Sequence, residues 1–457
     1  MHCAGYSAGR CNMRIIHTGD WHISRNADKR EESERCILAM INHAQLYPPD
    51  LFVISGDTVD ELDGRIMLDS EVAHSAIELV DSCAGIAPVV IIRGTRSHDR
   101  DTPAIFRHLR TVHRVHVASQ VEQVALIRYG DSCAFNSYAS ISPDHEVVAA
   151  LTLVPSLDKA YLMAQFEGSA RDGNMQAREL MHDLFAGLGM VNDSLPAGIP
   201  KIFVGHGMLT GSEFSTGQVA VGEDLEFSVN DLHQAHCDYY ALGHVHKYQQ
   251  HGGNVFFCGS PGRLNYGEQE DKGFLEVTFG SAAPVAQFMP LPARRLCFGE
   301  AIWDGDEAAF EAEVARVEAG ASGADVRFRY SIPEEDRHRV DRALLEQRFM
   351  AGGARKVKIE CQVVPAVRQR AAGISQARTL AEKVAQWGAT SDVAPITLGG
   401  AIEIASNIES RSVEELVAGC FPVVEAEPAP VDRKESTRAA LNRYFENNGA
   451  AVQGGLF

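Results

Sequence analysis

The chain has 457 residues, of which 45% are hydrophobic and 23% charged, the balance of a globular protein with room for a large domain and smaller modules. No apolar run approaches the roughly 20 residues of a membrane-spanning helix, so we expect no membrane partner and a cytoplasmic location. The formal net charge of -19 argues against broad nonspecific coating of nucleic acid, although local cationic sites remain open. The 10 cysteines include no C-x-x-C pair, which argues against a zinc ribbon and favours reduced thiols.

The first 285 residues or so have the pattern of a layered α/β domain. Residues 1–12 lack an apolar segment, so we interpret them as a disordered extension rather than a secretory signal. Strands are expected at 14–18, 51–55, 88–92, 201–204 and 238–242, with an amphipathic helix over 30–46. Because these strands are apolar throughout, both faces of their sheet should be covered by other layers.

Two further regions follow. Over residues 290–366 the pattern predicts strands at 295–303, 325–330 and 356–364, with a helix at 306–318 between the first two. Ser331-Ile332-Pro333-Glu334 fits a capping box for a second helix ending near residue 350, which completes a small α+β cap. Residues 367–424 contain helical stretches at 376–387 and 413–419, and 425–457 form a linker, a short charged helix and a flexible tail.

Polar side chains follow five of the predicted strands. They are Asp20-Trp21-His22, Gly56-Asp57, Gly94 to Asp99, Gly205-His206 and Gly243-His244-Val245-His246. Residues just past the strand ends line the ligand crevice of such sheets. Each fragment alone is a weak signal, but all of them in this order, each after an apolar strand, indicate a metal site.

In this order the fragments resemble the D-x-H, GD, G-x-HD-like, GH and GHxH signature of the calcineurin-like metallophosphoesterases. The arrangement of modules is similar to the SbcD-type nuclease subunits of SbcCD complexes. The resemblance implies a four-layer α-β-β-α sandwich over residues 13–285, a small α+β capping domain that contacts DNA, and C-terminal helices over 367–424 that bind an SbcC-like ATPase. It also implies a homodimer.

The resemblance further implies two divalent cations held by strand-end carboxylates and imidazoles: Asp20, His22 and His246 for the first, Asp57 as the bridge, His206 and His244 for the second. His98 would contact the scissile phosphate, and Asp99 would orient the His98 imidazole. Mixed carboxylate and imidazole ligands suit Mn, Fe or Zn better than Ca, and we expect Mn.

One element departs from the family pattern. The family has Gly-Asn-His followed by Asp or Glu, with the Asn carbonyl on the second metal, whereas this chain reads Gly94-Thr95-Arg96-Ser97-His98-Asp99. Ser97 aligns with the missing Asn, so we expect it to serve as a weaker neutral metal ligand and the second metal to bind more loosely.

Two further segments suggest partners. The stretch from Arg93 to His116 is rich in arginine, and we predict DNA contacts for Arg96, Arg100, Arg107 and Arg110; a solvated helix face is the alternative. The last five residues resemble the Q-x-x-L-F peptide that docks on sliding clamps, through Gln453, Leu456 and Phe457; a frayed terminus is the alternative.

The function that we expect is that of a Mn-dependent DNA exo/endonuclease that works with an SbcC-like ATPase in DNA end processing, repair or recombination. Two alternatives stay open. One is a phosphoesterase that acts on small molecules such as nucleotides, for which the cap and the arginines would be superfluous. The other is a DNA-end-binding scaffold that is catalytically weak because of its altered metal loop.

Overall fold

The computed structural model describes residues 13–62, 65–142, 144–157, 170–215, 226–280, 282–365, 374, 376–391, 393–413 and 415–416. The chain forms two compact units, Met1–Val364 and Pro365–Phe457. The predicted extension at 1–12 and the predicted linker, helix and tail at 425–457 lie outside the described residues.

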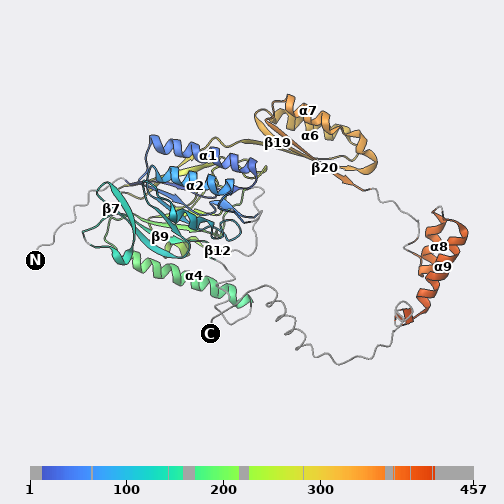
Figure 1. Ribbon diagram of the computed structural model, residues 1–457, viewed down its shortest axis with the longest axis horizontal. Coiled ribbons are helices and arrows are strands. Elements are labelled where there is room, and N and C mark those ends of the chain that lie inside the picture. Colours follow the sequence, from blue (N-terminus) through green and yellow to red (C-terminus); the bar gives the residue numbers. More distant parts are fainter. Residues whose placement is uncertain are drawn as a thin grey trace, which may run out of the picture. The chain divides into compact units, whose positions relative to one another are not determined.

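Two mixed sheets form the centre of the first unit (Figure 1). The first has the order β17-β16-β1-β3-β5-β6, where β1 (Met13–Thr18), β3 (Leu51–Ile54), β5 (Val89–Ile92) and β6 (Val115–Ala118) are parallel and β16 (Gly273–Phe279) and β17 (Val285–Pro290) are antiparallel additions. The second has the order β14-β15-β13-β10-β9-β7-β8. Its parallel strands are β15 (Val255–Phe257), β13 (Tyr239–Gly243), β10 (Lys201–His206) and β9 (Glu146–Val154), and its antiparallel strands are β14 (Gln249–His251), β7 (Glu122–Tyr129) and β8 (Ser132–Ser137).

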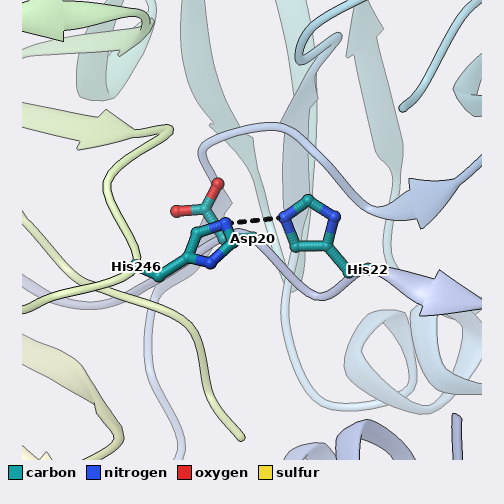
Figure 2. A group of neighbouring side chains, drawn as sticks. All are labelled: Asp20, His22 and His246. Atoms are coloured by element: carbon teal, nitrogen blue, oxygen red, sulfur yellow. Dashed lines mark hydrogen bonds between the residues drawn. The ribbon is translucent and has the colours of Figure 1, made fainter. Parts of the chain in front are cut away.

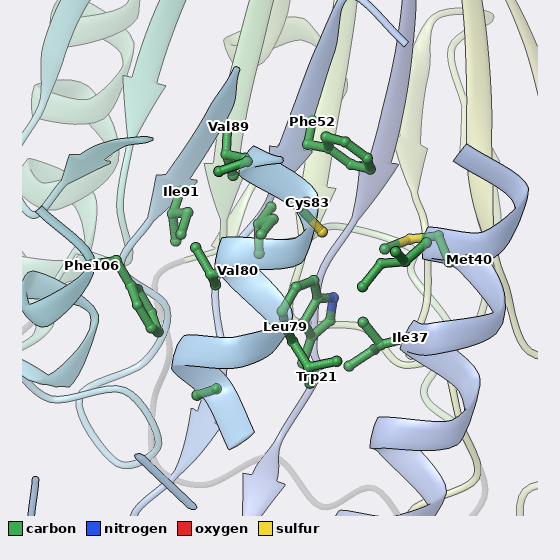
Figure 3. Close-up of a cluster of buried hydrophobic side chains, with 14 of the residues drawn as sticks. Trp21, Ile37, Met40, Phe52, Leu79, Val80, Cys83, Val89, Ile91 and Phe106 are labelled. Atoms are coloured by element: carbon green, nitrogen blue, oxygen red, sulfur yellow. The ribbon is translucent and has the colours of Figure 1, made fainter. Parts of the chain in front are cut away.

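Alternate residues of the buried strands enter different cores. Leu51 and Val53 of β3 pack between the two sheets, whereas Phe52 and Ile54 pack against α1 (Ala27–Leu46) and α2 (Glu71–Ala84) (Figure 3). On the other sheet, Phe203 of β10 packs with residues of α4 (Ala170–Asp193) and α5 (Val229–His233). Three cores separate four layers, so the predicted α-β-β-α sandwich is confirmed.

The two helices over the first sheet begin at side-chain caps. The Asn26 side chain accepts a hydrogen bond from Lys29 N, and the Ser70 hydroxyl accepts one from Ala73 N. Helix α1 therefore starts three residues before the predicted helix. The shorter elements are β2 (Ile23–Ser24), β4 (Val59–Asp60), η1 (Thr102–His108), η2 (Tyr138–Ser140), β11 (Met208–Leu209), β12 (Glu226–Phe227) and η3 (Glu334–Arg339).

The cap is a three-stranded parallel sheet covered by two helices. Its elements are β18 (Arg295–Ile302), α6 (Glu307–Gly320), β19 (Ala324–Pro333), α7 (Arg342–Ala351) and β20 (Lys356–Val364), so the predicted β-α-β-α-β order is confirmed. The predicted capping box at residues 331–334 is wrong. Ile332 and Pro333 pair with Val363 and Val364, which extends β19, and α7 begins after Asp341, whose carboxylate accepts the N–H groups of residues 343 and 344.

The second unit contains a pair of helices, α8 (Leu380–Ala389) and α9 (Pro395–Ser410) (Figure 1). Helix α8 corresponds to the predicted 376–387 stretch, whereas α9 was not predicted. Gly399 and Gly400 interrupt its pattern, and its capping residue Ala394 makes no side-chain hydrogen bond, so it lacks both sequence signals of a helix. Across the described residues, no helix combines the length and apolarity needed to cross a bilayer.

Candidate metal centre

Five strands carry Asp or His at or just beyond the same rim of the sandwich. β1, β3 and β5 are parallel neighbours in the first sheet, and β10 and β13 are parallel neighbours in the second. Because parallel neighbours end at the same edge and the two sheets share a core, their terminal side chains converge. The residues brought together are Asp20, His22, Asp57, His98, His206, His244 and His246.

The loop after β1 is anchored by the residue between two candidate ligands. Trp21 is fully buried in the core beneath α1 and α2, and its Nε1–H donates to Thr18 Oγ1 at 3.0 Å (Figure 3). Asp20 and His22 have φ values of 50° and 46°, in the left-handed region that non-glycine residues rarely adopt. Such strain clusters at functional sites and persists where surrounding structure enforces it, as the buried indole does here.

Close approach of the loops depends on two glycines. Gly56, with φ of 94°, would place a Cβ 2.5 Å from His206 Nδ1, and Gly94 would place one 2.1 Å from Asp57 Oδ1. Any side chain at either position would push the loops after β3 and β5 away from Asp57.

The first group of candidate ligands is Asp20, His22 and His246 (Figure 2). His22 Nε2 and His246 Nε2 face each other at 3.0 Å. Both carboxylate oxygens of Asp20 accept the backbone N–H of His244, at 2.9 and 3.1 Å, which fixes the carboxylate relative to the loop after β13.

The second group is Asp57, His206 and His244. His206 Nδ1 donates to the carbonyl of Ser55 at 2.7 Å, so its Nε2 is the atom turned towards Asp57 Oδ2, at 3.3 Å. Asp57 and His22 also form a third group with His98. The cluster is therefore continuous: His22 links the first group to the third, and Asp57 links the third to the second.

Burial and mutual charge shift the titration of this cluster. Burial raises the pKa of Asp20 and lowers the pKa of His22 well below its usual value. Burial alone would raise the pKa of Asp57, but the His206 and His22 imidazoles hold it well below its usual range. His206 shows the reverse balance, because the Asp57 charge outweighs burial and raises its pKa to about 9. The charged carboxylate of Asp57 and neutral His22 are the forms that bind a metal.

These residues fit a pair of divalent cations. Two carboxylates and four imidazoles offer oxygen and nitrogen donors, and within each group the donor atoms lie within 4.8 Å of one another. Asp57 Oδ2 faces nitrogens of both sides, at 3.3 Å from His206 Nε2 and 3.8 Å from His22 Nε2. Such a donor set suits Mn, Fe or Zn, and the cluster could hold two of them.

His98 is oriented by a carboxylate other than the predicted one. Its Nδ1 lies 3.1 Å from Asp60 Oδ1, in β4. Asp99 is instead buried, and its two oxygens accept the backbone N–H groups of Val59 at 3.1 Å and Gly94 at 2.7 Å. The orienting role predicted for Asp99 is therefore corrected: it fixes the loops on either side, and Asp60 holds the imidazole. Burial lowers the pKa of His98, but Asp60 and Asp57 outweigh it and raise the pKa overall.

Ser97 lies one hydrogen bond away from the metal cluster. Its hydroxyl donates to Thr95 Oγ1 at 3.1 Å, and the backbone N–H and hydroxyl of Thr95 donate to Asp57 Oδ1 at 2.7 and 3.1 Å. Thr95, which sequence reasoning passed over, is the residue in contact with Asp57.

The four predicted DNA-contacting arginines are all exposed but differ in their contacts. Arg100 Nε lies 3.2 Å from Glu61, and Arg107 donates to the Val117 carbonyl and to Ser119. Arg96 is separated by one residue from His98, and Arg110 follows η1. The predicted clamp-binding residues Gln453, Leu456 and Phe457 lie outside the described residues.

A buried ion pair lies behind His246, and sequence reasoning missed it. Glu268 Oε2 and Lys272 Nζ are 2.8 Å apart and almost fully buried, and Lys272 also donates to the His246 carbonyl at 2.9 Å. The only sequence signal was the i,i+4 spacing of Glu and Lys. Arg263 spends its guanidinium on backbone carbonyls, including those of Glu268 and Arg294, which agrees with the structural role predicted for its turn.

Comparison with known proteins places this site in a family. Calcineurin-like phosphoesterases match residues 13–248, just over half of the 457 residues. The chain is 24% identical over 270 residues to SbcD, the nuclease component of SbcCD, from Escherichia coli K12, and equally to SbcD from Escherichia coli O157:H7; the match covers 56% of this chain and 62% of each relative. A crystal structure of a dimetal phosphatase from Danio rerio aligns with a TM-score of 0.33 at 9% identity, covering 60% of this chain and 98% of that one. With its matched region spanning every strand end of the cluster, the chain belongs to the calcineurin-like phosphoesterase family.

Proposed function

We propose that the chain is a two-metal nuclease that hydrolyses phosphodiester bonds of DNA, with manganese as its cofactor. The observation that carries the proposal is the continuous cluster in which Asp57 belongs to two ligand groups, because a shared carboxylate is what a pair of cations requires. When bound, two such cations supply an activated water and stabilise the charge of the phosphate in an in-line displacement.

His98 is the proposed general acid. Asp60 engages its Nδ1, which leaves the Nε2–H for an oxygen of the scissile phosphate or of the leaving group. The raised pKa of His98 keeps the imidazole protonated near neutral pH, the form that can donate a proton. Its edge-on contact with His22, at 4.5 Å between ring centroids, places it beside the candidate ligands.

Two observations support DNA as the substrate. Exposed Arg96 and Arg100 lie within two residues of His98, where cationic side chains would meet the phosphates that flank a scissile bond. The curated relatives that match are named as components of a nuclease. The chain covers 62% of their length, so both the nuclease activity and its complex are proposed here for this chain.

An SbcC-like ATPase is the proposed partner, and α8 and α9 are the proposed contact. Within these two helices, only Gly388 and Ala405 are buried among the side chains that the structure describes. Large apolar residues remain exposed, including Trp387, Ile396 and Ile404. A helical partner such as a coiled coil would cover them, as in other helix-in-groove contacts. A sliding clamp remains a second proposed partner, through residues 453–457.

One assay tests the nuclease proposal against its alternatives. Purified protein with Mn²⁺ is given linear duplex DNA, single-stranded DNA and a chromogenic phosphodiester. His98→Ala should lower DNA cleavage about 10²- to 10⁴-fold, the contribution of a positioned general acid. The matched control is His108→Ala, which changes an exposed histidine at the end of η1.

The outcomes separate the three functions. Cleavage of DNA that His98→Ala loses and His108→Ala keeps supports a nuclease. Turnover of the small ester alone would indicate a small-molecule phosphoesterase. Binding of DNA ends without turnover of any substrate would indicate a scaffold.

A further inference from the structure

The loop after β5 contains two hydroxyl side chains whose hydrogen bonds lead to Asp57. Ser97 Oγ donates to Thr95 Oγ1 at 3.1 Å, and Thr95 Oγ1 donates to Asp57 Oδ1 at 3.1 Å. The Thr95 backbone N–H adds a second, shorter donation to the same oxygen, at 2.7 Å. A hydroxyl has one proton, so accepting from Ser97 directs the proton of Thr95 towards the carboxylate.

The two oxygens of Asp57 consequently have different surroundings. Oδ1 receives both donations from Thr95, and Gly94 approaches it so closely that a Cβ there would lie 2.1 Å away. Oδ2 lies 3.3 Å from His206 Nε2 and 3.8 Å from His22 Nε2, on the side of the candidate ligands. The loop thus fixes which oxygen faces the cations.

From these contacts we propose that Thr95 and Ser97 are positioning residues that act on the metal centre through Asp57, and that Ser97 is not a metal ligand. The pair replaces a direct neutral ligand by a hydroxyl relay: Ser97 orients Thr95, and Thr95 holds Asp57 Oδ1 so that Oδ2 alone faces both cations. This inference rests on the two-metal centre of the proposed function, but it is independent of the substrate.

A direct ligand and a relay differ in how their substitutions combine. If Ser97 acts through Thr95, removing its hydroxyl matters only while the Thr95 hydroxyl is present. If Ser97 binds the metal itself, the loss is the same with or without Thr95. A double-mutant cycle measures this difference, because residues in one hydrogen-bond network show coupling that independent sites lack.

The experiment measures Mn²⁺ binding by calorimetry and by electron paramagnetic resonance in the full-length protein. The variants are Thr95→Val, Ser97→Ala and their combination, with Thr95→Ser as the conservative change that keeps a hydroxyl. Thr95→Val should weaken binding by about 10-fold, the lower end of what partners of metal ligands contribute. Ser97→Ala should weaken it less, Thr95→Ser should remain near the unmodified protein, and the combination should match Thr95→Val alone.

Several results would overturn the relay. Equal losses of affinity from Ser97→Ala in the unmodified protein and in the Thr95→Val background would identify Ser97 as a ligand. Unchanged Mn²⁺ affinity in Thr95→Val would also refute the relay. Thermal melting of each variant without metal separates loss of binding from loss of folding. Should the unmodified protein itself bind fewer than two Mn²⁺ ions, the two-metal function fails; two bound ions without coupling reject only the relay.

Discussion

The metal rim of the first unit and the helical pair of the second are built on opposite terms. At the rim, Asp20, Asp57 and His206 are each at most 3% exposed, and their backbone and side chains are fixed by contacts from several strands. In the helical pair, Ile396 is 88% exposed and Ile404 61% exposed. Charged groups are buried in one region, and apolar groups are exposed in the other.

The difference shows where each region finds its stabilisation. Burying charged and polar groups costs free energy unless partners compensate, and the rim supplies those partners from within the chain. Exposed apolar side chains gain by burial, and the helical pair must find that gain on another surface. We therefore expect the rim to respond to protons and metal ions, and the helical pair to respond to a partner protein.

The largest effect should come from pH at the rim. The pKa of His206 is raised to about 9, because the charge of Asp57 outweighs burial, so a metal must displace a proton from this imidazole at neutral pH. Apparent Mn²⁺ affinity should rise with pH, by about 10-fold per unit, and level off above a pH of about 9. Titrations between about pH 6.5 and 8 in buffers of different ionisation enthalpy measure both the slope and the proton released.

The same shift sets the sign of the effect on the metal-free protein. A folded-state pKa above the usual 6.5 adds stability that is fully present below pH 6.5 and is lost as pH rises through about 9. Metal binding should therefore protect the protein most at the alkaline end, where the proton no longer does. Mn²⁺ affinity that stays constant across the range would show that His206 is neutral before the metal arrives.

A smaller effect is expected from the carboxylate that orients His98. Asp60→Asn keeps the size of the side chain but removes the charge that raises the pKa of His98. Turnover of a phosphodiester should fall about 10-fold, and the alkaline limb of the pH–rate profile should move to lower pH. Exposed Asp101→Asn is the matched control. A profile moved by Asp99→Asn and untouched by Asp60→Asn would return the orienting role to Asp99.

The helical pair should break without affecting the rim. A Cβ at Gly388 would lie 2.1 Å from Leu398 Cδ1, so Gly388→Val forces α8 and α9 apart. Such overpacking costs about 1–3 kcal/mol, which should appear as faster amide exchange over 380–410, while Mn²⁺-dependent hydrolysis of a small ester stays unchanged. Ala389→Val changes the exposed neighbour and serves as the control. Equal exchange in both variants would mean that the two helices do not stabilise each other.

The strand-end residues could be predicted because their positions depend on the sheet. Once 51–54 and 201–206 are recognised as buried parallel strands, Asp57 and His206 must fall at a common edge. Asp60 and Thr95 could not be found in that way. Their roles depend on how two loops fold against each other, and the bond from Asp60 to His98 spans 38 residues with no periodic signal.

Elsewhere, tertiary contacts outweighed the local pattern. The Ser331-to-Glu334 motif fits a helix start, but pairing with β20 holds Ile332 and Pro333 in a strand. Helix α9 contains two glycines that disfavour a helix locally, and it packs against α8, where Leu398 covers Gly388. In both cases the deciding contact came from a segment outside the window that the pattern covers.

The smallest effect should come from the exposed arginines beside the rim, which resemble the helical pair in depending on an external partner. Arg110→Ala should weaken DNA binding only a few-fold, and it should lower the salt dependence of binding by about one ion, as expected for one phosphate contact. Arg107 is the informative counterpart, because its guanidinium already donates to the Val117 carbonyl at 2.8 Å. Arg107→Ala should lower the melting temperature and leave the salt slope unchanged. The opposite assignment, a changed slope in Arg107→Ala and none in Arg110→Ala, would show that DNA displaces this internal contact and follows β6 rather than η1.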